Sequence, residues 1–393
     1  METRPGAVWG GVCRGLWDKV DARLPKPTRK SHFSDLEGSL SQIDERRASP
    51  INTRHKGDRR PMLAPGRAGS YRWGMRIATF NVNGIRAAGR RGFRDWLAAS
   101  DADVVALQEV RCQVRDLPMD VFGGYHLTYD SGELAGRNGV AILTREPPTG
   151  CFGWSDDIVR VNASAPPVRQ PSIFAREGRL IGVDLAGAGV TVVCVYVPKG
   201  GVPLAIAPVD GGREGYTPQQ QDDRYKRKLA FLRRFTAEIS ARRAACEMAG
   251  RQLLVLGDLN IAHGPADLHN WRGNLASEGF LPAERAWLDA TVGPAASSVR
   301  LDGRRILAPT VAWPAMIRPF VDVVRGLNPD VDGPYSWWSW QGQSFAKDVG
   351  WRIDYHLASP SLAATARRAW VDKAVSAEFR VSDHAPVVVD YAV

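Results

Sequence analysis

Short apolar runs alternate with longer stretches of helical periodicity from Met75 to the C-terminus. The runs are bounded by polar or glycine-containing segments, which is typical of strands. Expected strands lie at 76–81, 104–108, 140–144, 180–184, 190–197, 253–256, 352–358 and 387–390.

Helical spacing is clearest over 223–249, where Leu229, Leu232, Phe235 and Ile239 recur on one face. Further helices are expected at 91–100, 282–289 and 361–366, and the connections 198–222 and 293–338 are long enough to predict functional loops. Many short strands with fewer helices predict an α/β sandwich, in which two packed sheets are flanked by helices.

Residues 1–74 differ from the rest: they are rich in Arg, Pro, Gly and Ser, and only 35–47 could form a short helix. We expect a disordered extension, followed by a catalytic domain over 75–393. The net charge of +10 divides into +7 for residues 1–74 and +3 for the remainder, so the basic balance belongs mainly to the extension. The extension is either a dispensable tail, with Met75 as the true start, or an arm that tethers DNA.

Cysteine usage and hydropathy bear on the compartment. The five cysteines are odd in number, widely spaced and without a CxxC pair, which argues against a disulfide framework or a zinc site. No run approaches the ~18 apolar residues of a membrane span, and the N-terminus lacks the apolar stretch of a secretory signal. We predict a cytoplasmic protein that does not associate with membranes.

Polar side chains with catalytic potential gather where the expected strands begin or end. One such residue is an ordinary turn, but acids, amides, a tyrosine and a histidine at six strand ends indicate a site. These residues are Asn81, Glu109, Tyr196, Asp258, Asn260, Asp354, Asp383 and His384.

Metal-assisted hydrolysis of a phosphodiester suits these residue types. Mg²⁺ prefers oxygen ligands, which Glu109, Asp258 and Asp383 can supply, and Mn²⁺ is a possible substitute. The amides can contact the metal or the phosphate. His384 can contact the phosphate or transfer a proton, with Asp354 fixing its tautomer. GxSxG, HExxH and P-loop motifs are absent from the sequence.

Longer motifs add a resemblance that covers nearly all of 75–393. The chain is similar to the exonuclease III family of abasic-site endonucleases, within the endonuclease/exonuclease/phosphatase superfamily. The motifs are RIATFNVNGIRA, ADVVALQEVR, GRNGVAIL, VCVYVPKG, LLVLGDLNIAH, SEGFLPAERAWLD, YSWWSW, GWRIDYHLAS and SDHAPVVVDY. The resemblance implies a deoxyribonuclease I-like, four-layer α/β sandwich with the site at one edge.

The resemblance also implies roles. Asn81, Glu109, Asp258, Asn260, Asp383 and His384 match metal and phosphate positions. Asp258 matches the acid/base residue, Asn260 a stabiliser of the transition state, Asp354 the partner of His384, and Tyr196 a contact to the scissile phosphate. The identity of the general base and the number of metals stay open.

An aromatic segment matches the lesion pocket of that family. Trp337, Trp351 and Ile353 correspond to residues that line an apolar pocket for a flipped abasic sugar. The alternative for the tryptophans at 337–340 is core packing, but their polar surroundings favour a surface role. Candidate phosphate contacts are Arg111, Arg137, Lys199, Arg272, Lys347 and Arg352. Lys199 and Gln341 depart from the family pattern, which bears on substrate preference.

The expected function is therefore DNA repair. The enzyme would bind duplex DNA, act as a monomer, and hydrolyse the phosphodiester 5′ to an abasic site. By resemblance, 3′→5′ exonuclease and 3′-end-cleaning activities would accompany this reaction. Two rivals are a phosphatase of small esters, which would tolerate loss of Trp337 and Trp351, and a non-catalytic DNA-binding relative, which would lack one of the acids.

Overall fold

The structure is a computed structural model that describes residues 74–155, 158–161, 168–169, 173–209, 215–295 and 311–393. All of them belong to one compact unit, Ala68–Val393. The expected N-terminal extension, with its candidate helix at 35–47, lies outside the described residues. No helix among the described residues is long and apolar enough to cross a membrane.

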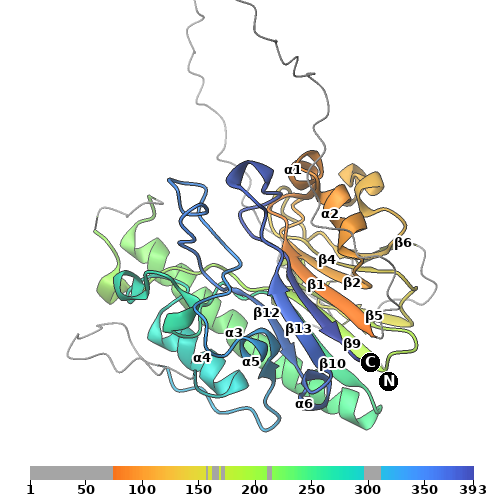
Figure 1. Ribbon diagram of the computed structural model, residues 1–393. Helices are drawn as coiled ribbons and strands as arrows, with labels where there is room; N and C mark the ends of the chain where they lie inside the picture. Colours follow the sequence, from red (N-terminus) through yellow and green to blue (C-terminus); the bar gives the residue numbers. More distant parts are fainter. Residues whose placement is uncertain (1–73, 156–157, 162–167, 170–172, 210–214, 296–310) are drawn as a thin grey trace, which may run out of the picture. The chain divides into compact units, whose positions relative to one another are not determined.

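Two mixed β-sheets form the centre of this unit (Figure 1). Within the described residues, the first sheet has the strand order β13 (Ala366–Val371), β14 (Val387–Tyr391), β1 (Met75–Asn81), β2 (Val104–Gln108), β4 (Val140–Thr144), β3 (His126–Asp130) and β6 (Val159–Val161). The second has the order β11 (Val321–Asp322), β12 (Asp354–Ala358), β10 (Gln252–Asp258), β9 (Val190–Tyr196), β8 (Leu180–Asp184), β5 (Gly150–Gly153) and β7 (Val168–Arg169).

The central strands of both sheets, such as β1, β2, β9 and β10, are buried on both faces. In β1, Ile77 packs between the sheets against residues such as Val192 and Leu254, whereas Ala78 and Phe80 pack against the outer helices. Successive side chains of a strand point to opposite faces, so a strand covered on both sides needs apolar residues throughout. This explains why the strands read as unbroken apolar runs.

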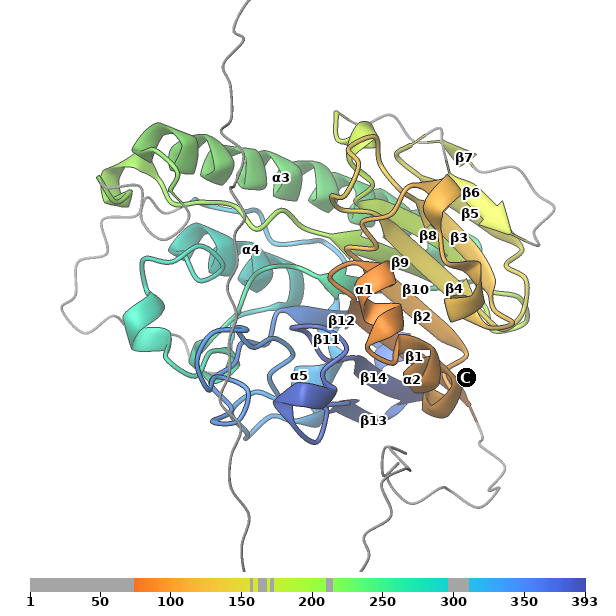
Figure 2. The same ribbon diagram turned by 90° about the horizontal axis from the view of Figure 1, so that it is seen from above.

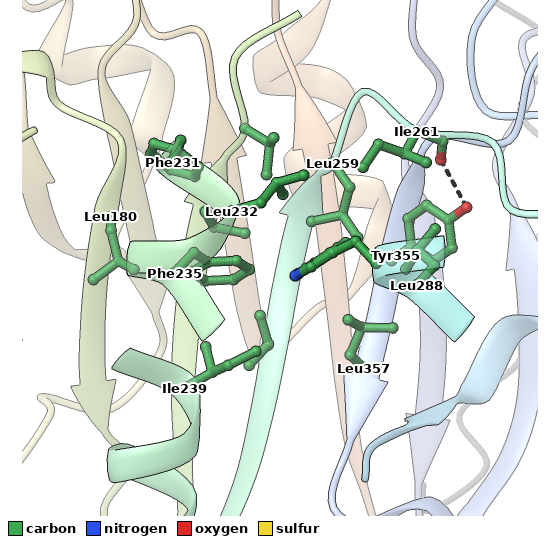
Figure 3. Close-up of a cluster of buried hydrophobic side chains, with 14 of the residues drawn as sticks. Leu180, Phe231, Leu232, Phe235, Ile239, Leu259, Ile261, Leu288, Tyr355 and Leu357 are labelled. Atoms are coloured by element: carbon green, nitrogen blue, oxygen red, sulfur yellow. Dashed lines mark hydrogen bonds between the residues drawn. The ribbon is translucent and has the colours of Figure 1, made fainter. Parts of the chain in front are cut away.

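Helices cover the outer face of each sheet, which gives four layers (Figure 2). Helices α1 (Ile85–Arg90) and α2 (Phe93–Ser100) pack on the first sheet. Helices α3 (Pro218–Met248) and α4 (Pro282–Val292) pack on the second sheet, where Phe231, Phe235 and Leu288 of the helices share one buried cluster with Leu357 of β12 (Figure 3). The four-layer α/β sandwich expected from the sequence is confirmed.

The expected strands all form, but several boundaries and short elements differ. Strands β3, β5, β6, β7, β11 and β13, and helices α1 and α5 (Val323–Leu327), were not expected. One expectation was wrong: the helix predicted at 361–366 ends as α6 (Pro360–Ala363), and Ala366 already pairs with Tyr391 in β13. Pairing with β14 outweighs the local preference of an alanine-rich segment.

Local chemistry explains the start of α3, five residues before the predicted one. Thr217 accepts a hydrogen bond from the Gln220 amide (3.2 Å), and the Gln220 side chain accepts one from the Thr217 amide (2.8 Å). This capping box, followed by Pro218, begins the helix. Short 3₁₀ helices occupy Val114–Asp116, Met119–Phe122, Ala175–Glu177, Leu204–Ile206, Pro265–Asp267, Trp271–Asn274 and Ala377–Phe379.

Candidate active site

Strand direction brings the polar strand ends to one edge of the sandwich. β1 and β2 run parallel, as do β9 and β10, so their carboxyl ends meet there. β12 and β14 run antiparallel to β10 and β1, so the residues at their beginnings reach the same edge. In register, Asp258 lies opposite both Tyr196 and Asp354. The first sheet contributes Asn81, Glu109, Asp383 and His384, and the second contributes Tyr196, Asp258, Asn260 and Asp354.

Asn81 connects the two sheets. Its side-chain amide donates to Glu109 Oε1 (3.0 Å) and to Asp258 Oδ2 (2.9 Å). Asn81 is fully buried and Asp258 is 1 % exposed, so neither group can exchange these partners for bulk water. The Asn81 amide therefore fixes two carboxylates from different sheets beside each other.

A second link between the sheets joins His384 to two acids. Nδ1 of His384 lies 2.8 Å from Asp354 Oδ2, and Nε2 lies 3.8 Å from Asp258 Oδ2. Asp354 therefore orients the imidazole so that Nε2 faces Asp258. Glu109, Asp258 and His384 thus lie close together, as the sequence analysis expected.

The buried charges shift one another's protonation. Burial raises the pKa of Asp258, and the nearby Asp354 and Glu109 carboxylates add to this effect against the pull of His384. Burial alone would lower the pKa of His384, but the carboxylates of Asp354, Asp258 and Asp383 together outweigh it and raise that pKa. Three acids beside one histidine leave an excess of negative charge that suits a bound cation.

Tyr196 closes the site at the end of β9 and is 9 % exposed. Burial raises the pKa of its phenol well above the usual value, and the Glu109 and Asp258 carboxylates raise it further. The hydroxyl therefore keeps its proton and acts as a hydrogen-bond donor. The Arg179 guanidinium lies over the ring, 4.9 Å from its centroid, and donates to the Tyr196 carbonyl (3.0 Å).

Backbone conformation is unusual around the site. Asn83, Glu109, Arg111 and Asn260 all have φ between 46° and 52°, a left-handed region that costs energy for residues with a side chain. The Asn83 amide donates to Asn81 Oδ1 (3.0 Å), and the Asn260 amide donates to Asp258 Oδ1 (2.8 Å). These bonds hold the turns that aim polar side chains at the site.

Asp383 lies slightly apart from the other acids. Its carboxylate accepts from Asn83 Nδ2 (2.8 Å) and from Trp337 Nε1 (3.1 Å). Burial alone would raise the pKa of Asp383, but His384 and these two donors outweigh it and lower that pKa. Asp383 is thus an ionised carboxylate held between Asn83 and Trp337.

The residues fit a divalent cation with oxygen ligands. Among the described residues, Asp258, Asp354 and His384 each offer a ligand atom, and these atoms lie within 4.8 Å of one another. Asp354 Oδ1 is buried without a hydrogen-bond partner in the described part of the chain. A buried carboxylate oxygen in that position is suited to a metal or its bound water.

The expected lesion-pocket residues also come together. Trp337 and Trp351 pack edge to face at 6.3 Å and surround Ile353 in a small apolar cluster with Leu268 and Phe280. Both tryptophans are only half-buried. Trp338 differs, because it is 1 % exposed and packs against Phe345 with its Nε1 donating to Asp348 (3.0 Å). For Trp338 the expected surface role was wrong, since it belongs to the core.

The candidate phosphate contacts divide into two kinds. Arg137, Lys199, Arg272 and Lys347 are exposed, and Arg111 is paired with Glu109 at the rim of the site. For Arg352 the predicted phosphate contact was wrong. Its guanidinium is 1 % exposed and pairs with Asp267 (2.7 Å) and Asp322 (2.8 Å). Arg352 is held in a buried ion-pair network and cannot reach DNA.

Several residues near the site received no role from the sequence. Asn83 holds Asp383, Phe280 lines the aromatic cluster, and Lys228 of α3 is fully buried behind Asn260. Lys228 left a signal: it stands three residues after Tyr225 and four before Leu232, within the apolar stripe of its helix. A lysine on a buried stripe indicates a specific partner.

Comparisons with known proteins agree with this geometry. A model of the Endonuclease/Exonuclease/phosphatase family matches residues 78–384. An exodeoxyribonuclease of Bacillus subtilis is 27 % identical over 315 residues, covering 80 % of this chain and 98 % of the relative. The DNA repair nuclease APEX1 of Danio rerio is 28 % identical over 325 residues, covering 81 % and 83 %.

A solved structure of an AP endonuclease from Archaeoglobus fulgidus superimposes with a TM-score of 0.58 and 25 % identity, covering 81 % of this chain and 100 % of that one. The strand-end motifs at the active edge thus fall inside the matched region. The chain belongs to the endonuclease/exonuclease/phosphatase family and is a phosphodiester hydrolase of the exonuclease and abasic-site endonuclease type.

Proposed function

We propose that this enzyme hydrolyses the phosphodiester 5′ to an abasic site in duplex DNA, in a reaction that depends on Mg²⁺. The observation that carries the proposal is the direct connection between the polar site and the aromatic cluster. The backbone of Trp337 bridges both to Trp351 and to His384, and its indole donates to Asp383. A sugar seated on Trp337 and Trp351 would place its 5′ phosphate beside His384.

Asp258, Glu109 and Asp354 would hold the metal through carboxylate oxygens, with Asn81 and Asn260 as amide ligands or phosphate contacts. When bound, Mg²⁺ would polarise a phosphate oxygen and offset charge on the leaving 3′ oxygen. Mn²⁺ satisfies the same oxygen ligands and would substitute.

The protein side chains would carry the remaining steps. Asp258 would accept a proton from the attacking water, since its Oδ2 lies 3.8 Å from His384 Nε2, beside which the phosphate would bind. His384, Tyr196 and Asn260 would donate hydrogen bonds to the phosphate oxygens as charge develops on them. The water oxygen would bond to phosphorus as the phosphorus–O3′ bond breaks, and O3′ would take up a proton from solvent. The products are a 3′-hydroxyl end and a 5′-deoxyribose-phosphate end.

Selection of the lesion would come from the aromatic cluster. An abasic sugar is unpaired and small, so extruding it costs less than extruding a paired nucleotide. Trp337, Trp351 and Ile353, backed by Leu268 and Phe280, would accept the bare sugar and exclude one that carries a base. Exonuclease and 3′-end-cleaning activities would use the same phosphate site, which the likeness to an exodeoxyribonuclease supports.

Replacing Trp351 by alanine tests the proposal. We expect kcat/KM for incision of a fluorescent duplex with one abasic analogue to fall at least about 30-fold, because the sugar loses an apolar wall. Hydrolysis of a small phosphate ester by the same variant should change less than about threefold. Trp370→Ala, on β13 outside the cluster, is the matched control and should incise normally.

A phosphatase of small esters would show the opposite pattern. Wild-type enzyme that hydrolyses the ester but leaves the abasic duplex intact, or a Trp351→Ala variant that incises as fast as wild type, would contradict the proposed function.

The departure at Lys199 leads to a second prediction. Its Nζ lies 3.6 Å from Glu278 Oε1 at the rim of the site, and the Lys199 side chain is 50 % exposed. We propose that Lys199 contacts a DNA phosphate and that Glu278 competes for it. Glu278→Gln should tighten DNA binding, whereas Lys199→Gln should weaken it and reduce the slope of log K against log salt by about one. Binding titrations at several salt concentrations measure both effects, and unchanged slopes would rule out the contact.

We further propose that residues 75–393 form the catalytic domain and that the enzyme acts as a monomer. The family match over 78–384 supports the first point, because it leaves the first 77 residues unmatched. Incision by a 75–393 truncation, and its elution in size-exclusion chromatography, would test both.

A further inference from the structure

A buried lysine lies directly behind the proposed phosphate site. Lys228 of α3 and Glu284 of α4 are both fully buried, and Lys228 Nζ lies 2.6 Å from Glu284 Oε1. Nζ also donates to two backbone carbonyls, those of Lys199 (3.1 Å) and Asn260 (2.9 Å). The three donors of the ammonium group thus reach three separate segments of the chain.

Two of these segments belong to the site. Lys199 lies in the turn that follows β9 and Tyr196, and Asn260 lies in the turn that follows β10 and Asp258. Packing around the lysine is close: a Cβ added to Gly200, whose φ is +89°, would lie 2.7 Å from Lys228 Cδ. The turn after β9 therefore needs glycine there to fit against the lysine stem.

The orientation of the Asn260 side chain depends on the hydrogen bond between Lys228 and the Asn260 carbonyl. Its φ of 51° is unfavourable for a residue with a side chain, so the turn needs external support. Leu259 and Ile261 are buried on either side and anchor the turn in the core of the second sheet (Figure 3). The carbonyl of Asn260 is bound by Lys228 while its side-chain amide donates to Val197 (2.9 Å) and Asp258 (3.3 Å).

Glu284 keeps the lysine in place. One carboxylate oxygen contacts Nζ, and the other accepts from the Leu281 amide (3.0 Å) at the start of α4. A buried ion pair recovers little net stability over an apolar pair of the same size, because both charges lose their hydration. A gain in stability is therefore a weak explanation for a lysine at this position. Its hydrogen bonds to the two backbone carbonyls explain it better.

We propose that Lys228 is a positioning residue for phosphodiester hydrolysis. It sets the turn that carries Asn260 against the turn that follows Tyr196, so that Asn260 meets the reacting phosphate in the correct orientation. Lys228 itself does not touch substrate and acts through the two carbonyls. The proposal rests on the function proposed above only for the choice of substrate.

Variants at the pair separate positioning from stability. Lys228→Met leaves Glu284 charged and buried without its cation, so the melting temperature should fall. The double variant Lys228→Met/Glu284→Gln removes both charges and should regain most of that stability, but the two carbonyls still lack their donor. Glu284→Gln alone removes the negative charge but retains a side-chain oxygen that can face Nζ, so the lysine should stay on both carbonyls.

We expect kcat on the abasic duplex to fall at least tenfold in Lys228→Met and in the double variant, with KM changed less than threefold. Glu284→Gln should stay within threefold of wild-type kcat. Hydrogen exchange should become faster in peptides that contain 198–201 and 258–263 in both lysine variants, measured without DNA or metal.

Arg76→Met is the matched control. Arg76 is another buried cation, paired with Asp390 (2.7 Å) and donating to the Ser100 carbonyl (2.9 Å). It stands five residues before Asn81 on β1, about 17 Å from the site along the strand. Its loss should lower stability while leaving kcat and the exchange of 258–263 unchanged.

Full recovery of both stability and kcat in the double variant would overturn the proposal, because the pair would then serve folding alone. Unchanged exchange at 258–263 would overturn it as well. Wild-type enzyme that does not cut abasic DNA would instead refute the proposed substrate, and the exchange measurement would still decide whether Lys228 sets the turns.

Discussion

Replacing Asp258 by asparagine is expected to lower kcat for incision by about 10³-fold or more, because it removes a metal ligand and the proposed proton acceptor together. The substitution is nearly isosteric. One oxygen remains to accept from Asn81 or from the Asn260 amide, which now bind both carboxylate oxygens. The fold should therefore persist, and single-turnover incision of the abasic duplex measures the effect.

Stability should respond differently from activity. Burial raises the pKa of Asp258, which means that the ionised carboxylate is disfavoured in the folded protein. A neutral side chain removes this cost, so without divalent cations the melting temperature should stay level or rise. Asp390→Asn, at the other end of the first sheet, should keep full activity. Activity of Asp258→Asn within tenfold of wild type would contradict the assignment.

Removing divalent cations is expected to abolish incision, and adding Mg²⁺ should restore it. The acids at the active edge carry more negative charge than His384 can balance, so a cation is needed both to bind the phosphate and to relieve their repulsion. The measurement compares metal-stripped enzyme in EDTA with the same enzyme after addition of Mg²⁺ or Mn²⁺.

Thermal stability provides a second measurement of metal binding, which needs no substrate. Mg²⁺ at 100 times its Kd should stabilise the folded enzyme by about 2.7 kcal/mol, because only the folded state holds the site. The melting temperature of wild type should therefore rise with Mg²⁺, that of Asp354→Asn should rise less, and that of the exposed-acid control Glu146→Gln should rise normally. Equal incision in EDTA and in Mg²⁺ would exclude the metal-dependent mechanism.

Most of the polar site could be located from the sequence, because the ends of strands can be recognised where an apolar run gives way to polar residues. Asn81 and Asp258 each end an apolar strand and Asp354 begins one. Parallel strands end at one edge of a sheet, and an antiparallel strand begins at that same edge. What the sequence could not show was which neighbours they would meet. The Asn81 amide between Glu109 and Asp258 is a contact between sheets, and no local pattern encodes the distance between two sheets.

Residues of the same type with similar sequence neighbours occupy different environments in the structure. Trp337 and Trp338 are adjacent, yet one flanks the site and the other is buried against Phe345. Arg352 adjoins Trp351 of the aromatic cluster and was predicted to contact phosphate. Its guanidinium instead pairs with two carboxylates distant in sequence, Asp267 and Asp322. Such outcomes depend on partners that only folding brings together.

The sequence by itself determined the four layers and the edge at which polar groups collect, because strands covered on both faces must be apolar throughout and must end in polar turns. Only the tertiary structure decided the pairings: Asn81 across two sheets, His384 between two acids, and Lys228 beneath two turns. The physical reason is that strand and helix patterns arise from neighbours along the chain, whereas the site arises from side chains that lie between 28 and 177 residues apart in the sequence.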